Sequence, residues 1–382
     1  MRLIINATNL QSGGALQVAS GLLKEWDIAF PEHEYHVFLS PQLQVLLQLQ
    51  DFSSRFLFYS FDHNPGSSVW RALTVRRKLS GLEQQIRPQI VFTIFGPALW
   101  RPATSHICGF ANGYYLFDRS AYIRDHVRTN LLLRIWYYSR RFLLLRQLYR
   151  EADLLWVETD MARQQLLQEW PQVSPPIAVI GNTYNSELQR RDGQMTHDPY
   201  RFLCLAAYYP HKNLGILAGA ARILKKRNRL CRIVVTLPDE TYERLFADQE
   251  LAGYFENKGP VFGPGLSDLY AGVDAIVFPS LLETFSAVYP EALYMGKPVL
   301  TADLNFAKRI CGDAALYFDP LNAGSIADLM CRLMDDEALY LEQQQRGYEQ
   351  LKTMETPLSR AAKLMALMAG AVNNKAEFLC AE

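Results

Sequence analysis

Residues Val273 to Thr301 read Val-Asp-Ala-Ile-Val-Phe-Pro-Ser-Leu-Leu-Glu-Thr-Phe-Ser-Ala-Val-Tyr-Pro-Glu-Ala-Leu-Tyr-Met-Gly-Lys-Pro-Val-Leu-Thr, and they predict a strand, a loop, a helix and a second strand. Ala275–Phe278 is a short apolar run rich in β-forming residues, which indicates a buried strand. The loop after it carries Glu283. The following helix is expected to end at Gly296, because a glycine commonly closes a helix ahead of a proline.

The loop and the helix after the first strand are where a ligand is expected. In an open parallel sheet, ligands bind outside the carboxyl ends of the strands. Glu283 and the backbone N–H groups of Phe285, Ser286 and Ala287 therefore lie where a ligand would sit, with helix-terminus donors free for an anion. Glu291 follows Glu283 after seven intervening residues. Such a pair alone is also compatible with two solvated carboxylates on one helix.

Strands and helices alternate along the rest of the chain. The strands expected in the first half are Arg2–Ile5, Tyr35–Leu39, Arg55–Tyr59, Gln89–Ile94, His106–Phe110, Ala152–Val157 and Pro176–Ile180. Those expected in the second half are Arg201–Ala206, Arg232–Thr236, Val261–Gly263, Ala275–Phe278, Pro298–Thr301 and Ala314–Phe318. The alternation predicts an α/β fold with two doubly wound parallel sheets.

The chain has 382 residues, 49% of them hydrophobic, which is enough for two ordinary α/β domains. We expect a first domain over 1–185, a polar and aperiodic linker over 186–200, and a second domain over 201–355. Residues 356–382 are expected to form a C-terminal helix and tail that pack back toward the first domain.

Composition restricts the partners. The formal net charge is zero, so the whole chain carries no broad electrostatic signal for nucleic acid. No apolar run approaches the ~18 residues that span a bilayer, and the polar start of the chain does not resemble a signal peptide. Six scattered cysteines without metal-ligand spacing are typical of reduced thiols, so we expect a cytoplasmic protein without a metal site.

Two further segments stand out in the first half. Gly13 and Gly14 lie between the first strand and its helix, where backbone N–H groups can approach a phosphate, although such a pair can also be a simple turn. From Arg119 to Arg150, eight arginines against one aspartate give a formal charge of +7, with leucine and aromatic residues between them. Interfacial helices have this composition. The alternative is a core helix whose arginines are paired or reach solvent.

The stretch around Glu283 and Glu291 resembles the Glu-x7-Glu signature of retaining glycosyltransferases of the GT-B fold, family 4 type, which have two facing Rossmann-like domains with a central cleft. The resemblance covers nearly the whole chain and is strongest over residues 200–330. It implies a nucleotide-sugar donor held mainly by the second domain, an acceptor bound by the first, and catalysis in the cleft.

The resemblance also implies roles for particular residues. Glu291 would accept hydrogen bonds from the ribose hydroxyls, and Glu283 would hold the hydroxyls of the donor sugar. Lys212 matches the lysine that neutralises the diphosphate. Stabilising charge on the departing diphosphate is the central task, and a lysine with preorganised amides can do it without a metal. No Asp-x-Asp triplet, the usual metal–diphosphate clamp, occurs in the chain.

The remaining roles concern loops. The amides of Phe285, Ser286 and Ala287 would lie against the sugar and diphosphate, with the Gly13–Gly14 loop opposite them. The first-domain loop that faces the sugar often carries a histidine, and here Asn112 is the candidate in that region.

The chain departs from the family pattern at three places. Ala207 stands where the family commonly has an arginine of the diphosphate clamp, and a nearby tyrosine or His211 is a possible replacement. Thr284–Ser286 replaces the usual Gly-Phe-Gly. The strand residue His106 lies upstream of the loop in which Asn112 replaces the histidine.

We therefore expect a cytoplasmic hexosyltransferase that uses a GDP- or UDP-sugar, acts on a glycan and needs no cofactor. The expected context is bacterial surface polysaccharide assembly (O-antigen, capsule or lipopolysaccharide) on a lipid-linked acceptor, with Arg119–Arg150 against the inner face of the cell membrane. Two alternatives stay open: a non-hydrolysing nucleotide-sugar epimerase of the same fold, and a catalytically silent binding subunit of a glycan-assembly complex. Paired carboxylates also occur in glycosidases, but the nucleotide-sugar context disfavours that class.

Overall fold

The structure is a computed structural model that describes residues 1–11, 13–61, 69–128, 130–169, 175–190, 197–261, 263 and 265–379. The chain divides into two compact units. The first contains Met1–Asn182 together with the chain from Glu355 onward, and the second contains Thr183–Met354. The residues expected to form the linker, as far as they are described, are therefore part of the second unit.

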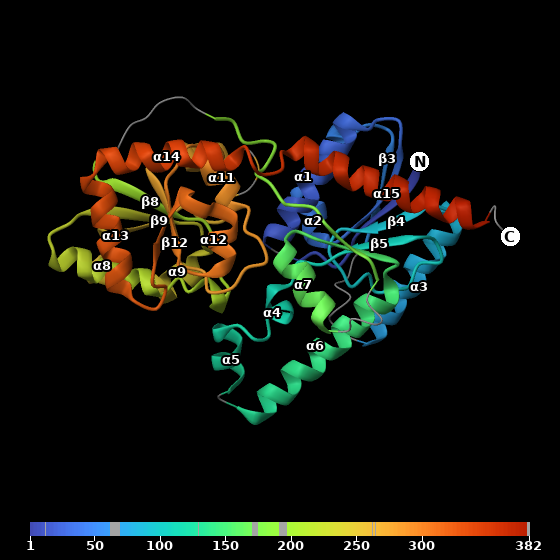
Figure 1. The fold of residues 1–382 in the computed structure, drawn as a ribbon, viewed down its shortest axis with the longest axis horizontal. Coiled ribbons are helices and arrows are strands. Elements are labelled where there is room, and N and C mark those ends of the chain that lie inside the picture. The colour runs from blue at the N-terminus through green and yellow to red at the C-terminus, as the bar shows by residue number, and fades with distance from the viewer. Residues whose placement is uncertain are drawn as a thin grey trace. The chain divides into compact units, whose positions relative to one another are not determined.

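The first unit has one parallel sheet, with its strands in the order β3-β2-β1-β4-β5-β6-β7 (Figure 1). The strands are β1 (Arg2–Ala7), β2 (Glu34–Leu39), β3 (Phe56–Ser60), β4 (Ile90–Thr93), β5 (His106–Gly109), β6 (Leu154–Val157) and β7 (Ile177–Val179). Its helices are α1 (Gly14–Ala29), α2 (Pro41–Leu46), α3 (Val69–Ile86), α4 (Gly113–Leu116), α5 (Ala121–Arg128), α6 (Leu131–Glu151), α7 (Asp160–Glu169) and α15 (Pro357–Leu379).

The C-terminal helix α15 completes the core of the first unit. It packs along α1, and the buried Trp26 indole of α1 donates a hydrogen bond to the carbonyl oxygen of Ala361 at 3.1 Å. Beside this contact, the buried Arg360 guanidinium donates to both carboxylate oxygens of Glu25, at 2.8 and 3.0 Å. A buried ion pair that lost one partner would be strongly destabilising, so this pair fixes where α15 lies on α1.

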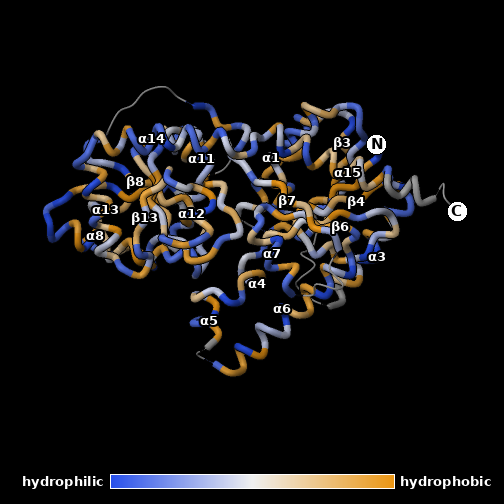
Figure 2. The backbone as a smooth tube through the Cα atoms, viewed as in Figure 1, coloured by the Kyte–Doolittle hydropathy of each residue, from blue (hydrophilic) through white to orange (hydrophobic). Residues whose placement is uncertain are grey.

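The second unit has a second parallel sheet, in the order β10-β9-β8-β11-β12-β13. The strands are β8 (Tyr200–Cys204), β9 (Cys231–Val235), β10 (Phe255–Asn257), β11 (Ala275–Phe278), β12 (Val299–Ala302) and β13 (Ala315–Phe318). Its helices are α8 (Ile216–Lys226), α9 (Asp239–Phe246), α10 (Gly265–Ala271), α11 (Val288–Tyr294), α12 (Asn305–Cys311), α13 (Ala323–Asp335) and α14 (Glu337–Leu351). Figure 2 shows that hydrophobic residues concentrate along the strands of each unit, as expected of strands covered on both faces.

One predicted strand is wrong. Val261 and Gly263 lie in no strand, and Phe262 is outside the described residues. The edge strand is β10, which pairs with β9 through Phe255 opposite Ile233. Phe255 stacks on Phe246 of α9 with a ring-centroid distance of 4.2 Å. A three-residue strand with one buried apolar side chain is too short to show a period, and this tertiary contact selects it.

The prediction of two doubly wound parallel sheets is confirmed. In each sheet the order of the strands reverses at one point, between β1 and β4 in the first unit and between β8 and β11 in the second. The loops after these four strands therefore form the crevices where open α/β sheets bind ligands. No helix in the described ranges is long and apolar enough to cross a membrane.

Candidate active site

Two of the predicted residues meet at the switch point of the second unit. Lys212 follows β8 at the end of a short 3-10 turn, Pro210–Lys212, and Glu283 follows β11. The loops that carry them are tied together, because the backbone N–H of Leu281 donates to the carbonyl oxygen of His211 at 2.7 Å. Adjacent parallel strands thus bring together residues that lie 71 positions apart in the chain.

The carboxylate of Glu283 receives two donors on the same oxygen. Lys212 Nζ donates to Glu283 Oε1 at 2.5 Å, and Ser280 Oγ donates to that atom at 2.6 Å. The side chains of Lys212 and Glu283 are only 14% and 10% exposed, so the pair is far less screened than a surface salt bridge. Glu283 Oε2 has no hydrogen-bond partner in the described part of the chain. One oxygen is held and the other is available.

Free backbone donors follow this carboxylate. The N–H groups of Phe285, Ser286 and Ala287 have no acceptor within the described residues. The helix α11 begins only at Val288, and no side chain caps its start. The other end of α11 agrees with the sequence prediction, because Gly296 has the left-handed φ of +67° that favours glycine at a helix end.

Glu291 lies on α11 and is almost completely buried, at 5% exposure. The hydroxyl of Tyr270 donates to its Oε2 at 2.9 Å, and the backbone N–H of Asn185 also bonds to the carboxylate. Burial raises the pKa of Glu291 to about 7, against the opposing effect of these two hydrogen bonds. The carboxylate thus changes charge near neutral pH, and a ligand must displace or share its present partners to reach it.

Sequence reasoning missed Ser280 and Tyr270. Ser280 is fully buried and directly follows the β11 strand with its proline, so its place at the strand end was the one available signal. Nothing in the sequence distinguished Tyr270, because its role depends on how α10 packs against α11. Neither residue was assigned a role from spacing alone.

Ala207, which stands where related enzymes commonly have an arginine that contacts the diphosphate, supplies no charge. Ala207 is exposed, and the next residue, Tyr208, has the Arg244 guanidinium of α9 over its ring at 4.7 Å from the ring centroid. Burial lowers the pKa of His211, which stacks on Tyr209, so this imidazole is neutral at pH 7.

The predicted residues of the first unit occupy loop positions at the sheet edge. Gly13 has φ +68° and ψ −151°, a conformation that suits glycine, and it precedes the first turn of α1. Around Gly14 a Cβ would meet open space, so that glycine is not required by packing. The exposed Asn112 follows β5 and is the N-cap of α4, because its Oδ1 accepts from the N–H of Tyr115 at 3.3 Å. Asn112 therefore has a structural role whatever else it does.

His106 is a core residue of β5. Its Nε2 lies 2.8 Å from Thr93 Oγ1, and its Nδ1 lies 2.7 Å from the carbonyl oxygen of Glu151. Complete burial lowers its pKa to about 4, so the ring stays neutral. It is a satisfied core histidine, which is the reading that the sequence favoured.

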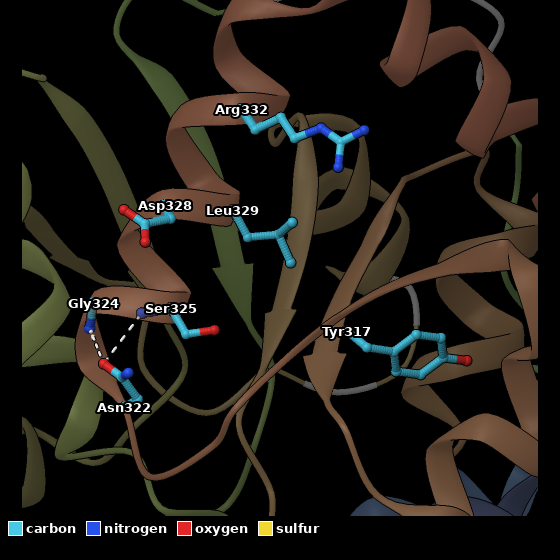
Figure 3. Close-up of a pocket in the computed structure, with 7 residues that line it drawn as sticks. All are labelled: Tyr317, Asn322, Gly324, Ser325, Asp328, Leu329 and Arg332. Atoms are coloured by element: carbon cyan, nitrogen blue, oxygen red, sulfur yellow. Dashed lines mark hydrogen bonds between the residues drawn. The ribbon is translucent and has the colours of Figure 1, made fainter.

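The second unit also contains a cavity of about 390 Å³ beside β13 and α13 (Figure 3). Its lining residues are Tyr317, Asn322, Gly324, Ser325, Asp328, Leu329 and Arg332. The first N–H groups of α13 are already capped, because Asn322 Oδ1 accepts from Gly324 and Ser325 at 2.9 and 3.3 Å, the dashed lines of Figure 3. None of the predicted site residues lines this cavity.

The described residues include no group of three or more histidine, cysteine, aspartate or glutamate side chains that could hold a metal ion. Two Rossmann-like units, with a lysine–carboxylate pair at the switch point of the second, place the chain in the GT-B class of folds. Residues 199–336 match the family described as glycosyl transferases group 1. This match lies within the second unit and supports the likeness to group 1 glycosyltransferases that the two glutamates suggested.

Two curated relatives match part of the chain. D-inositol 3-phosphate glycosyltransferase of Pseudarthrobacter chlorophenolicus is 27% identical over 158 residues, which are 39% of this chain and 38% of the relative. O-antigen chain mannosyltransferase B of Escherichia coli is 26% identical over 156 residues, 39% of this chain and 41% of the relative. The chain thus spans about two fifths of the length of these relatives.

Three solved structures share the whole fold. Sucrose-phosphate synthase of Thermosynechococcus elongatus has a TM-score of 0.74 at 14% identity and covers 100% of both chains. WaaG, a glycosyltransferase involved in lipopolysaccharide biosynthesis, has 0.73 at 14%, covering 97% of this chain and 100% of its own. HepE of Anabaena, solved with UDP and glucose, has 0.71 at 12%, with the same coverage. At these identities the likeness shows the fold alone.

Proposed function

We propose that the chain is a glycosyltransferase that moves a hexose from a GDP- or UDP-sugar to a hydroxyl of a glycan. The observation that carries the proposal is the group at the β8–β11 switch point: Lys212 and Glu283 in contact, Ser280 behind them, and three unpaired backbone N–H groups in the next residues. A cation and free amides suit a diphosphate, and a half-free carboxylate suits sugar hydroxyls. HepE, a neighbour in fold, was solved with UDP and glucose, which supports a nucleotide-sugar donor.

The residues would divide the work as follows. Negative charge develops on the diphosphate as the sugar leaves, and Lys212 Nζ with the amides of Phe285–Ala287 would stabilise it. Glu283 Oε2 would accept hydrogen bonds from the sugar hydroxyls while Ser280 keeps Oε1 in place. Glu283 holds Lys212 through a largely buried ion pair, so the lysine would be oriented at the site for the diphosphate. This arrangement needs no metal, and we propose that the enzyme works without one.

Glu291 would bind the ribose hydroxyls of the nucleotide. Its carboxylate already accepts a hydrogen bond from the hydroxyl group of Tyr270, so it can accept hydrogen bonds from ribose hydroxyl groups in the same way. Because the side chain is buried, binding would include a small shift of α10 or of the chain around Asn185. The nucleotide would then replace protein donors with its own, which favours a ligand with two adjacent hydroxyls.

The acceptor would bind the first unit, near Gly13, Gly14 and Asn112, and the anomeric configuration would be retained. The functions of two similar proteins, an O-antigen mannosyltransferase and a lipopolysaccharide glycosyltransferase, support a surface polysaccharide acceptor. We propose a lipid-linked glycan as this acceptor, with the enzyme at the inner face of the cell membrane and the Arg119–Arg150 segment as the contact.

A thermal-shift panel tests the donor site. The full chain is heated with UDP, GDP, ADP, dTDP and CMP and with their sugar conjugates, without metal. A ligand that binds only the native state raises stability by RT ln(1 + [L]/Kd), so a hundredfold excess over Kd gives about 2.7 kcal/mol. We expect one base to stand out, and we expect Glu291→Ala to remove its shift.

The matched control for that panel is Ser325→Ala in the cavity of Figure 3, which should keep the shift of the wild type. A hit is then followed by a test for transfer of the sugar to a glycan acceptor and by analysis of the anomeric configuration in the product. A flat panel with folded protein would contradict the proposal and favour the silent binding subunit. A nucleotide-sugar converted to its epimer without acceptor would favour the epimerase.

A further inference from the structure

The first half of α6 is exposed to solvent although it is rich in large apolar residues. Between Leu131 and Leu143, seven such side chains are between 42% and 75% exposed. They are Leu131, Leu132, Ile135, Trp136, Tyr138, Phe142 and Leu143. Scattered exposed apolar residues are normal on soluble proteins, but a contiguous group on one helix marks an interaction surface. Figure 1 shows this half of α6 extending away from the sheet of the first unit.

The exposed apolar residues form two adjacent rows. Leu131, Ile135 and Phe142 lie at positions i, i+4 and i+11, and Leu132, Trp136 and Leu143 repeat that spacing one residue later. At about 100° per residue, the two rows cover a continuous arc on the side away from the buried residues of the helix. Those buried residues are Tyr137, Arg141, Leu145 and Leu148. Figure 2 shows the alternation of hydrophobic and hydrophilic residues along this helix.

Arginines accompany the apolar rows. Arg146 and Arg150 continue the same face toward the C-terminal end of α6, and the Arg140 guanidinium lies over the Trp136 ring at 5.0 Å from its centroid. No ion pair is formed by Arg134, Arg140, Arg146 or Arg150 within the described part of the chain. No acidic residue occurs from 130 to 150, so nothing on this helix face neutralises them.

Arg141 is different and does not belong to this surface. Its guanidinium donates to both carboxylate oxygens of Glu169, at 2.9 and 2.6 Å, and to the carbonyl oxygen of Tyr115 at 2.7 Å. Its side chain is 8% exposed. Arg141 therefore fixes α6 to α4 and α7, and it leaves the opposite face of the helix pointing outward.

We propose that the exposed face of α6 lies on the surface of an anionic lipid bilayer, parallel to it, with the two apolar rows at the boundary of headgroups and acyl chains. Arg140, Arg146 and Arg150 would then meet lipid phosphates, and Trp136 would sit at headgroup depth. The proposal assigns residues to the membrane contact of the proposed function. It stands apart from sugar transfer, because vesicle binding requires no donor.

The charge pattern favours a bilayer over a second copy of the chain. In a symmetric dimer the same patch meets itself, which would place unpaired arginines against unpaired arginines without an acid between them. A nucleic acid would match the arginines but not the apolar rows. An anionic bilayer matches both, because it offers phosphates at its surface and hydrocarbon just beneath.

The experiment is co-sedimentation of the full chain with vesicles of phosphatidylglycerol and phosphatidylethanolamine, and with vesicles of phosphatidylcholine alone. At about 0.1 M salt, we expect the anionic vesicles to bind about 10- to 100-fold more tightly, since three arginines contribute. The variant Leu132→Ser, Trp136→Ser, Leu143→Ser should lose most binding to both. The variant Arg140→Gln, Arg146→Gln, Arg150→Gln should bind anionic vesicles no better than neutral ones.

Matched controls come from the second unit, where Leu230, Leu321 and Leu341 are also exposed. Their replacement by serine should leave binding unchanged, and all variants should keep the wild-type Tm because the replaced side chains are exposed. The Trp136 emission, taken as wild type minus Trp136→Phe, should shift to shorter wavelength with anionic vesicles.

Three results would overturn the proposal. They are an absence of vesicle binding by the wild type, binding by both triple variants that equals the wild type, or a wild-type dimer that the apolar triple variant abolishes. If the triple variants lose vesicle binding but still transfer sugar to a soluble acceptor, the exposed face of α6 acts in membrane binding and not in catalysis. Loss of transfer with binding intact would instead count against the proposed function.

Discussion

The two switch points have the same topology but different chemistry. In the first unit, neutral side chains hold the loops after β1 and β4. The Asn9 amide donates to the carbonyl oxygens of Phe95 and Pro97 at 2.6 and 3.1 Å, and Thr8 donates to Asn6 at 2.8 Å. In the second unit, the loops after β8 and β11 meet through the charged pair of Lys212 and Glu283. The same strand order therefore gives two different contacts between loops. We call the uncharged contact of Asn9 in the first unit the neutral junction, and the Lys212–Glu283 pair in the second unit the ionic junction.

This difference indicates how the two units divide the proposed reaction. A diphosphate brings negative charge, which a lysine and free amides can stabilise, whereas a glycan acceptor brings neutral hydroxyl groups. The ionic junction suits the donor and the neutral junction suits the acceptor. If that interpretation is correct, changes at the ionic junction should affect turnover most, and matched changes at the neutral junction should affect it little.

The largest effect is expected for Lys212→Ala. Removing the cation should lower kcat by about 10²- to 10³-fold, because a preorganised charge next to the departing diphosphate is lost. The measurement is steady-state transfer with the donor identified by the thermal-shift panel. Lys226→Ala, an exposed lysine at the end of α8, is the control. A Lys212→Ala rate within threefold of the wild type would remove Lys212 from the mechanism.

The second effect concerns Glu291→Gln and the pH dependence of nucleotide binding. Burial raises the pKa of Glu291 to about 7, so the wild-type side chain is mostly protonated at pH 6 and mostly ionised at pH 8. The carboxylate accepts hydroxyl groups more strongly than the acid does, so Kd should fall by about tenfold over this range. Titration calorimetry at pH 6, 7 and 8 measures it. Glu291→Gln should bind weakly at every pH; a wild-type Kd that rises with pH would contradict the assignment.

A smaller effect is expected for Ser280→Ala. Glu283 would lose one of its two donors but keep Lys212, so turnover should fall by about 3- to 10-fold, in the range of one ordinary hydrogen bond. The KM for the donor should rise with little change in Tm, whereas a purely structural role would lower Tm and leave KM unchanged. Ser280→Thr, which keeps the hydroxyl, should restore part of the activity. An unchanged KM in Ser280→Ala would exclude a positioning role.

The ionic junction could be predicted from sequence better than its surroundings. The apolar run of β11 and the glycine that ends α11 are local signals, and they placed Glu283 at a strand end. Lys212 was found through the family resemblance. Ser280 and Tyr270 were missed, because each acts through a contact that depends on packing between elements and not on a local pattern.

The arginine segment shows the same limit. Composition indicated an interfacial helix, but the spacing of the arginines did not show which of them face outward. Packing separates them, since Arg141 is paired with Glu169 in the interior while Arg140, its neighbour, lies on Trp136 at the surface. The position of the short strand β10 could not be predicted from the sequence either, because it depends on the stacking of Phe255 on Phe246, which is a tertiary contact.

The last prediction concerns stability and no change in turnover. It compares the two buried glutamates whose pKa values burial raises to about 7, Glu151 in the first unit and Glu291 in the second. Glu151 is held by the N–H of Ala98 and by Gln147, both at 2.7 Å. Since its pKa is higher folded than unfolded, the folded state retains the proton longer, and Glu151 costs stability as pH rises from about 4.5 to 7.

Glu151→Gln cannot ionise, so its stability relative to the wild type should increase by about 2–3 kcal/mol between pH 4.5 and 7, a shift of a few degrees in Tm. Thermal melts across this range measure it, with and without the nucleotide found in the panel. Nucleotide should leave the difference in stability between Glu151→Gln and the wild type unchanged, because Glu151 is in the first unit and the nucleotide is proposed to bind the second. For Glu291→Gln, nucleotide should change the difference in stability from the wild type, because the nucleotide is proposed to contact the Glu291 carboxylate. If nucleotide altered both differences equally, the assignment of the donor to the second unit alone would be wrong.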